Sequence, residues 1–349
     1  MSNKIGVGVL GATGMVGQHF IKFLANHPWF EVTWVGASDR SAGKKYNEAT
    51  SWRLDGAMPA GVASLTVKEC KPETGAPQIM FSATDASVAT EIERAFAEAG
   101  HTVVSNSRNH RMEADVPLLV PEINPGHLAS LPVQKKKRGW KGQIATNPNC
   151  STIVLTMALA PLKKFGIQRV VVTTMQAISG AGYPGVPSMD ITANVVPFIG
   201  GEEEKMEIET QKILGDWKRG GFQPHPMKVS AHCNRVPVVD GHTVTISVEF
   251  AKKPTEAAII KAFAEWRSIP QERNLPSAPK QPVIYMPEKD RPQPRRDVER
   301  EHGMAVFVGR LRPCPVFDYK FIALGHNTIR GAAGAAVLNA ELMKSEGLL

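Results

Sequence analysis

A glycine triplet near the start of the chain is the sequence feature that most constrains the fold. It consists of Gly11, Gly14 and Gly17, and it comes directly after the apolar run Ile5–Leu10. Apolar residues then recur at helical spacing through Met15–Asn26. A strand, a tight turn and a helix in this order predict the first unit of a parallel sheet that is wound with helices.

The same alternation continues through the first 150 residues. Further strands are predicted at Glu31–Ala37, Gln78–Ala83, Thr102–Ser105 and Gln143–Thr146, and a helix is predicted at Ala86–Ala99. Strands that alternate with helices form right-handed parallel units. We therefore expect an α/β fold in which residues 1–150 form a Rossmann-like dinucleotide-binding domain.

The pattern changes after residue 150. Alternating apolar and polar residues predict half-buried antiparallel strands at Gln168–Gln176 and His242–Phe250. Helices are predicted around these strands, at Thr152–Lys164, Glu202–Asp216 and Thr255–Arg267. Residues 151–325 are therefore expected to form a second domain of the α+β class.

Two segments near the C-terminus fit neither pattern. Pro270–Arg300 contains seven prolines and many charges, which predicts an extended surface excursion rather than part of the core. Thr328–Ser345 is rich in alanine and helical in pattern, and Gly331 and Gly334 near its start are small enough for a close approach. We expect residues 326–349 to return to the first domain as a helix.

Composition excludes several functional classes. The chain has 349 residues, of which 42% are hydrophobic and 21% charged, as in folded globular proteins. Its net charge of +8 comes without a finger, basic-zipper or RNP pattern, so we expect no nucleic-acid partner but small anionic ligands. No apolar stretch is long enough to predict a membrane span. The four cysteines lie far apart, which predicts a reducing, cytoplasmic compartment and no metal site.

The glycine triplet also suits a phosphate group. Its bare backbone lets a pyrophosphate approach the N–H groups at the positive end of a helix, although a plain tight turn is the alternative. After the second strand, Arg40 has Ser38 and Ser41 beside it, and a guanidinium among hydroxyls suits the 2′-phosphate of NADP. Asp39 keeps NAD open as an alternative, and a solvated loop is another. We expect NADP, held by Gly11, Thr13, Gly14, Met15, Val16, Ser38, Arg40, Ser41, Ser82 and Thr84.

One cysteine has the setting of a nucleophile. Cys150 lies between a predicted strand and a long apolar helix, where the helix dipole lowers the free energy of a thiolate. Cys70, Cys233 and Cys314 lack this setting, and a buried, inert thiol is the alternative for Cys150. A cysteine nucleophile beside a nicotinamide suggests aldehyde oxidation through a thioester.

A cation and an imidazole stand together at the entry to a later strand. Arg235 suits a carboxylate, and His242 follows it after seven residues. A histidine on its own is more often a surface or core residue than a catalyst. The glycine-rich turn Gln176–Gly182 and the charge run Glu202–Lys205 are equally weak alone, because loops and solvated helix faces share these patterns.

Together these motifs resemble one family. The segments GATGMVG, SDRS, NPNCST, QAISGAG, GEEEK, RVPVVDGH and GHNTIRGAAG are similar, in order and spacing, to those of aspartate-β-semialdehyde dehydrogenases of the archaeal and fungal type. The resemblance runs from Gly6 to the C-terminal helix. The related N-acetylglutamyl-phosphate reductases share the architecture and the cysteine, but they are less similar around GEEEK and RVPVVDGH.

The resemblance implies a reaction. NADPH would reduce β-aspartyl phosphate to aspartate semialdehyde and phosphate, a step toward threonine, methionine and, in many organisms, lysine. Cys150 would carry the acyl group as a thioester, with His242 as the acid and base and Gln176 beside the reacting carbon. Arg235 would hold the substrate carboxylate. The competing class is a binding protein that keeps the fold without chemistry, either a redox sensor or a basic nucleic-acid-associated factor.

The resemblance also implies binding residues and an assembly. Glu202 would lie near the substrate amino group, and Arg111, Asn149 and Lys205 near phosphate, with Arg108 as a competitor for the place of Arg111. The positions on the nicotinamide side are Ser179, Gly180 and Asn327. The second domain would then be the catalytic and dimerisation domain of a homodimer or homotetramer.

Overall fold

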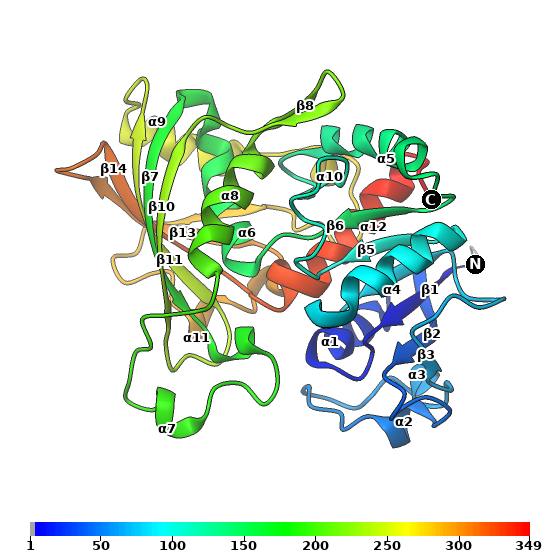
Figure 1. Ribbon diagram of the computed structural model, residues 1–349. Helices are drawn as coiled ribbons and strands as arrows, with labels where there is room; N and C mark the ends of the chain where they lie inside the picture. The colour runs from blue at the N-terminus through cyan, green and yellow to red at the C-terminus, as the bar shows by residue number, and fades with distance from the viewer. Residues whose placement is uncertain (1–3) are drawn as a thin grey trace.

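The computed structural model describes residues 4–349, and its first half contains a six-stranded parallel sheet (Figure 1). The strand order is β3-β2-β1-β4-β5-β6, and every neighbouring pair is parallel. This confirms the predicted dinucleotide-binding fold class. The strands are β1 (Ile5–Leu10), β2 (Phe30–Ala37), β3 (Lys68–Glu69), β4 (Ile79–Ser82), β5 (Thr102–Ser105) and β6 (Gln143–Thr146).

The helices of this half follow the local sequence signals closely. Helix α4 spans Ala86–Ala99 as predicted, because the Asp85 carboxylate accepts the Ser87 backbone N–H at one end and Gly100 takes a left-handed φ of 111° at the other. Helix α1 ends at Leu24, two residues before the predicted Asn26. The helices are α1 (Met15–Leu24), α2 (Tyr46–Ala49), α3 (Ala60–Ala63), α4 (Ala86–Ala99), η1 (Pro125–Ala129) and α5 (Ser130–Arg138).

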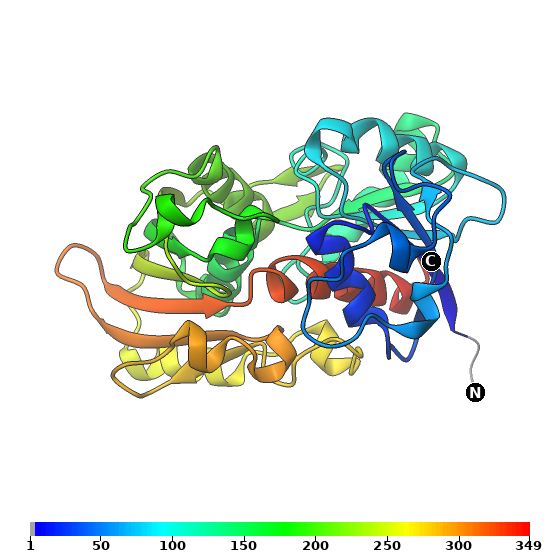
Figure 2. The same cartoon turned by 90° about the horizontal axis from the view of Figure 1, so that it is seen from below.

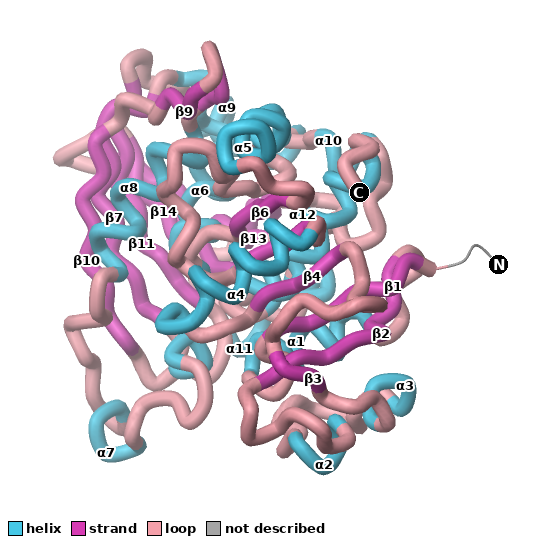
Figure 3. The backbone as a smooth tube through the Cα atoms, turned by 45° about the vertical axis from the view of Figure 1, so that its right-hand side comes forward, coloured by secondary structure: helices cyan, strands magenta, loops and turns pink. Residues whose placement is uncertain are grey.

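The second half contains a six-stranded mixed sheet, and Figure 3 shows the two sheets as separate groups of strands. Its order is β10-β7-β11-β14-β13-β12, in which β10 with β7 and β12 with β13 are parallel and the other pairs antiparallel. The predicted antiparallel strands therefore pair as expected, within a mixed sheet. The strands are β7 (Ile167–Gln176), β10 (Lys228–Arg235), β11 (His242–Phe250), β12 (Val283–Met286), β13 (Val306–Pro313) and β14 (Tyr319–Gly325), and β8 (Asp216–Lys218) with β9 (Gly221–Gln223) forms a separate hairpin.

Helix α6 is the central element of this half. Residues 151–159 of α6 are all buried, and the helix packs on β11, β13 and β14 on one side and on α8 on another. It continues as a short 3-10 helix to Phe165, close to the predicted Lys164. The helices here are α6 (Cys150–Leu159), η2 (Ala160–Phe165), η3 (Ile178–Ala181), α7 (Ser188–Ile191), α8 (Glu202–Leu214), α9 (Glu256–Glu265), α10 (Ile269–Glu272), α11 (Pro294–Asp297) and η4 (Arg300–Gly303).

The prediction for the proline-rich segment was wrong in part. Strand β12 pairs with β13, and Val283 is fully buried in the core of the second sheet. Prolines stand just outside this strand, at Pro282 and Pro287, so that its own backbone N–H groups are free to pair. The carboxylate of Asp297 is also buried, where it accepts hydrogen bonds from the Arg291 guanidinium and a backbone N–H.

The C-terminal segment packs against the first sheet. A π-helical turn, η5 (Ile329–Ala333), leads into α12 (Gly334–Ser345), which lies beside α1 in Figure 2. Val337, Leu338 and Leu342 of α12 are fully buried with residues of β1 and β4. Among residues 4–349, no helix is long and apolar enough to cross a membrane.

Leu338→Ala tests whether α12 is part of the first core. Leu338 is fully buried, so its truncation is expected to lower the free energy of unfolding by about 2–5 kcal/mol, measured by urea denaturation. Val316→Ala, at a site that is 80% exposed, is the control and should change it by less than about 0.5 kcal/mol. Equal effects of the two variants would contradict this packing.

Candidate active site

The candidate nucleophile lies at the amino end of a buried helix. Cys150 is the first residue of α6, and Asn149 caps the helix. The Asn149 Oδ1 accepts the backbone N–H groups of Ser151 and Thr152, at 3.0 and 3.1 Å. Because Asn149 cannot leave its cap without loss of these bonds, the thiol beside it is held in place.

His242 is the partner of this thiol. Its Nε2 lies 3.1 Å from the Cys150 Sγ, although the two residues are 92 positions apart. The backbone N–H of Ala177 donates to the Nδ1, also at 3.1 Å. Since Nδ1 accepts a hydrogen bond, the neutral ring carries its hydrogen on Nε2 and directs it at sulfur.

Burial keeps both members of this pair neutral. It lowers the pKa of His242 to about 3, with further lowering by the positive charge of Arg235. It raises the pKa of Cys150 to about 12, helped by the Glu202 carboxylate and opposed by Arg111 and Arg235. The thiolate stabilisation that we expected from the helix end is therefore outweighed, and the pair rests as thiol and imidazole.

Arg235 lies on the other side of the histidine. It ends β10, is buried, and its Nη1 donates to the Ala177 carbonyl at 2.7 Å. A Cβ at Gly180 would stand 2.9 Å from both the Arg235 Nη1 and the His242 Cε1. The turn after β7 therefore needs glycine at this position, because only a bare backbone fits against these two side chains.

Glu202 is the hub of a second set of contacts. It begins α8, and its carboxylate accepts hydrogen bonds from Asn149 Nδ2 at 2.8 and 3.0 Å, Lys205 Nζ at 2.7 Å and Gln176 Nε2 at 3.3 Å. Burial opposes its ionisation, but Lys205 and these donors hold the pKa of Glu202 below its usual range. The structure thus brings together the residues that the sequence placed around the substrate.

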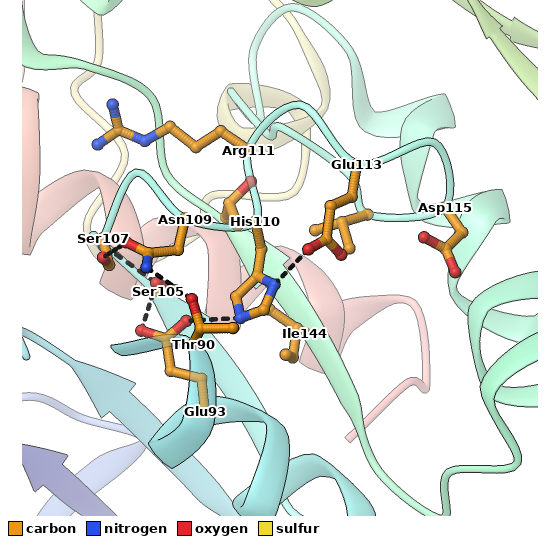
Figure 4. A network of polar contacts seen from close by, with 12 residues as sticks. Thr90, Glu93, Ser105, Ser107, Asn109, His110, Arg111, Glu113, Asp115 and Ile144 are labelled. Carbon is orange, nitrogen blue, oxygen red and sulfur yellow. Dashed lines mark hydrogen bonds and ion pairs between the residues drawn. The ribbon is translucent and has the colours of Figure 1, made fainter. Parts of the chain in front are cut away.

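Arg108 and Arg111, the two candidates for the phosphate contact, differ in exposure. Arg108 is exposed, whereas Arg111 is 7% exposed and donates from Nη1 to the Glu209 Oε1 at 3.0 Å and from Nη2 to the Asn106 carbonyl at 2.8 Å. Figure 4 shows its side chain directed away from His110 and the carboxylates that surround it. Of these two arginines, Arg111 is therefore the one with a buried side chain.

Two features of the site escaped the sequence analysis. Buried Glu209 and Lys212 lie with buried Glu202 and half-buried Lys205 on one face of α8, whereas a charge run usually marks a solvated face. The helical spacing of these four charges was the available signal. Gly331 was noted for its small size only; a Cβ there would stand 2.7 Å from the Cys150 Cβ.

The predicted cofactor residues gather at one edge of the first sheet. They lie at or directly after the carboxyl ends of the neighbouring strands β2, β1 and β4, and parallel strands end at the same edge. Gly11 has a φ of +73°, and a Cβ at Gly17 would stand 2.3 Å from the Gly11 carbonyl oxygen, so this turn needs both glycines. The residues at this edge are Gly11, Thr13, Gly14, Met15, Val16, Ser38, Arg40, Ser41, Ser82 and Thr84.

The remaining cofactor candidates lie where the two halves of the chain meet. The Asn327 Nδ2 donates to the Ser179 Oγ at 2.7 Å, and the Asn327 Oδ1 accepts the Gly241 N–H at 2.8 Å. A cavity of about 1400 Å³ is lined by Met15 of the first half and by Ser179 and His326 of the second. These contacts connect the loop after β7, which also carries Gly180, to the segment after β14.

The protonation of His242 can be measured directly. Because its pKa is lowered to about 3, we expect a neutral ring with hydrogen on Nε2 throughout pH 5–8, whereas an ordinary histidine titrates near 6.5. Ring ¹⁵N NMR of histidine-labelled protein reports both the charge and the tautomer. His242→Gln assigns the resonance by its loss. A midpoint near pH 6.5, or hydrogen on Nδ1, would contradict the geometry.

Comparison with known proteins places this site in a family. Residues 6–131 match the family model "Semialdehyde dehydrogenase, NAD binding domain", and residues 159–330 match "Semialdehyde dehydrogenase, dimerisation domain". The chain is 49% identical to the aspartate-semialdehyde dehydrogenase of Archaeoglobus fulgidus, over 99% of this chain and 100% of that one. It is 52% identical to that of Methanothermobacter thermautotrophicus, over 97% and 99%.

Solved structures agree with the sequence relatives. The crystal structure of aspartate semialdehyde dehydrogenase with NADP from Candida albicans has a TM-score of 0.92 and 46% identity, and the match covers 99% of this chain and 100% of that one. The Vibrio cholerae aspartate semialdehyde dehydrogenase II complexed with ASA has a TM-score of 0.78 and 27% identity, with 99% of both chains covered. The chain therefore belongs to the semialdehyde dehydrogenase family, among the aspartate-semialdehyde dehydrogenases.

Proposed function

We propose that the protein catalyses the reversible, NADP-dependent conversion of β-aspartyl phosphate to aspartate semialdehyde and phosphate. The observation that carries the proposal is the 3.1 Å contact between the Cys150 Sγ and the His242 Nε2, beside buried Arg235 and Glu202. A thiol and an imidazole in contact suit acyl transfer. The product serves the synthesis of threonine, methionine and related amino acids.

The residues around the thiol suit the groups of this substrate. Arg235 takes the α-carboxylate, because a guanidinium can donate two parallel hydrogen bonds to it. The Glu202 carboxylate takes the substrate ammonium, and Arg111, Lys205 and Asn149 take the phosphate. Gln176 lies next to Glu202, at 3.3 Å, and orients the reacting carbonyl. Each charge of the substrate thus meets a charge of opposite sign.

The reaction begins at sulfur. The Cys150 thiolate attacks the acyl carbon, the carbon–oxygen bond to phosphate breaks, and phosphate leaves with the electron pair while a thioester forms. NADPH, when bound, supplies the hydride that reduces this thioester. A proton goes to the former carbonyl oxygen as the hydride arrives, and it leaves that oxygen again when the carbon–sulfur bond breaks, so that the neutral aldehyde and the thiolate are released.

His242 moves the proton in these steps. The structure sets a condition on the tautomer from which it can accept that proton. For Nε2 to accept the thiol proton, the ring has to hold its hydrogen on Nδ1 and give up the hydrogen bond from Ala177. Arg235 donates to the carbonyl of the same Ala177. We therefore assign the shift of the His242 hydrogen from Nε2 to Nδ1 to substrate binding. The substrate carboxylate that Arg235 takes up competes with the Ala177 carbonyl for the guanidinium.

The first domain suits NADP. Helix α1 begins after Gly14, which has no side chain to cap it, so the first N–H groups of the helix are open to a pyrophosphate. Arg40 and Ser38 are exposed at the end of β2, where the adenosine ribose of a bound dinucleotide lies. Ser179, Gly180 and Asn327 suit the nicotinamide, because Ser179 lines a cavity with Met15 of α1 and accepts from Asn327, and Gly180 lies against His242.

The assembly belongs to the same proposal. The match to a dimerisation domain supports a homo-oligomer, and we propose a homodimer or homotetramer formed through the second domain. Large apolar side chains are exposed on that domain, among them Met189 at 89% and Phe198 at 73%. Contacts between subunits would remove these side chains from water. Size-exclusion chromatography with light scattering measures the assembly.

The direct test is an assay with both candidate substrates. Reduction of NADP is measured with aspartate semialdehyde plus phosphate and, in parallel, with N-acetylglutamyl semialdehyde plus phosphate. We expect turnover with the first and far less with the second. Cofactor binding without turnover would instead indicate a sensor, and preference for the second substrate would indicate the related reductase.

Cys150→Ser tests the thioester. A hydroxyl is a much weaker nucleophile than a thiolate, so turnover should fall at least about 10³-fold. NADP binding, followed by fluorescence titration, should be retained because Cys150 does not hold the cofactor. Turnover near that of the unaltered protein would rule out acyl transfer to this sulfur.

Arg40→Ala tests the choice of cofactor. Loss of a charged hydrogen bond to the 2′-phosphate should weaken NADP by about 10–100-fold. NAD lacks this phosphate, so its affinity should change little and serves as the internal control. Equal weakening of both cofactors would show that Arg40 supports its loop instead.

A further inference from the structure

Glu209 has no part in the proposed chemistry, yet it contacts two parts of the site. It lies on the buried face of α8, and the residue is 2% exposed. Its Oε1 accepts from the Arg111 Nη1 at 3.0 Å, and its Oε2 accepts the Asn149 backbone N–H at 2.8 Å. One carboxylate thus joins the guanidinium to the residue that precedes Cys150.

The guanidinium that Glu209 holds has a buried donor without a partner in the described part of the chain. Glu209 and the Asn106 carbonyl take one hydrogen each from Nη1 and Nη2. The Arg111 Nε is buried and has no hydrogen-bond partner among the described residues. A buried, positively charged donor without a partner is costly, so this edge of the guanidinium is suited to an anion.

Contacts other than those of Glu209 hold the backbone of the loop that carries Arg111. The Lys212 Nζ, from α8, donates to the carbonyls of Arg111, Glu113 and Val116 at 2.7–2.9 Å. On the other side, the His110 Nδ1 lies 2.8 Å from the Glu113 carboxylate, within the network drawn in Figure 4. With the backbone held in this way, the direction of the Arg111 side chain depends on Glu209 and the Asn106 carbonyl.

We propose that Glu209 is a positioning residue. It couples the phosphate-binding guanidinium of Arg111 to the backbone of the nucleophile turn, which is the segment of Asn149 and Cys150. The inference rests on the proposed function, in which Arg111 binds phosphate. Attack on an acyl phosphate requires the leaving group at a set distance from sulfur, and a misplacement of about 1 Å costs about 10²-fold in rate. By holding both Arg111 and Asn149, Glu209 removes their freedom to move apart.

Glu209→Gln is the main test, with the assay run in the direction that consumes phosphate. The amide has nearly the same shape but presents N–H groups toward Arg111 or Asn149, so it cannot accept from both. We expect KM for phosphate to rise about 10-fold or more and kcat to fall, on the scale of a displaced charged contact. KM for aspartate semialdehyde and for NADP should stay within about twofold, since Arg235 and the cofactor edge of the first sheet have no contact with Glu209.

Controls separate this role from general stability. Glu204→Gln changes an exposed carboxylate on the same helix and should leave all three KM values unchanged. A uniform rise of all three in Glu209→Gln, together with a lower Tm, would overturn the positioning role. If Glu209→Gln does not fold, Glu209→Asp keeps the charge but is too short to reach both partners, and the same selective rise is expected.

Arg111→Ala distinguishes the failure of this inference from that of the proposed function. If Arg111→Ala leaves KM for phosphate unchanged, the proposed phosphate site is wrong. If it raises KM while Glu209→Gln does not, only the positioning role is overturned. Because Glu209 positions Arg111 relative to Asn149, the double variant should raise KM for phosphate by less than the product of the two single effects, and fully additive effects would contradict the coupling. Phosphate should also protect Cys150 against iodoacetamide. The phosphate concentrations needed for protection should rank the unaltered protein and the variants in the same order as KM for phosphate, without turnover.

Discussion

The hydrogen bonds of Asn149 fix the amino end of α6, and the rest of the site is placed relative to that end. Its Oδ1 caps the helix, its Nδ2 donates to Glu202, and its backbone N–H donates to Glu209. Both carboxylates come from α8, so one helix of the second half holds the residue before the nucleophile from two directions. A position that uses every polar atom of its side chain is poorly replaced by any other residue type.

Desolvation has a double effect on the chemistry. In the absence of substrate it keeps Cys150 and His242 neutral, which limits unwanted reaction of the thiol. The same low polarity strengthens the attraction of Arg111 and Arg235 for an anionic substrate. The helix end alone is too weak to ionise a thiol in this setting, because its effect is about that of half a charge. Activation therefore depends on groups that the substrate brings or displaces.

The parts of the fold and site that were predictable rest on local signals. Helix α4 spans the predicted residues, and in the structure an Asp cap and a left-handed glycine bound it. The cysteine at a helix start and the glycine turn after β1 likewise follow from neighbouring residues. Strand β12 was missed because its pairing with β13 depends on residues more than twenty positions away, and prolines around it favour a loop. Glu209 was missed because helical spacing groups these charges on one face of α8, whereas the burial of that face depends on tertiary contacts.

The C-terminal segment of the chain also supports the nucleophile turn. Arg330 is fully buried in the π-helical turn, and its two Nη atoms donate to the Glu122 carboxylate at 2.7 Å each. The next residue is Gly331, against which the Cys150 side chain packs. A π-helical turn is a rare conformation that is found mostly at functional sites. The buried ion pair ties this turn to a loop of the first half, and α12 beyond it packs in the first core. The thiol is thus held by α8 on one side and on another by a turn that both halves of the chain stabilise.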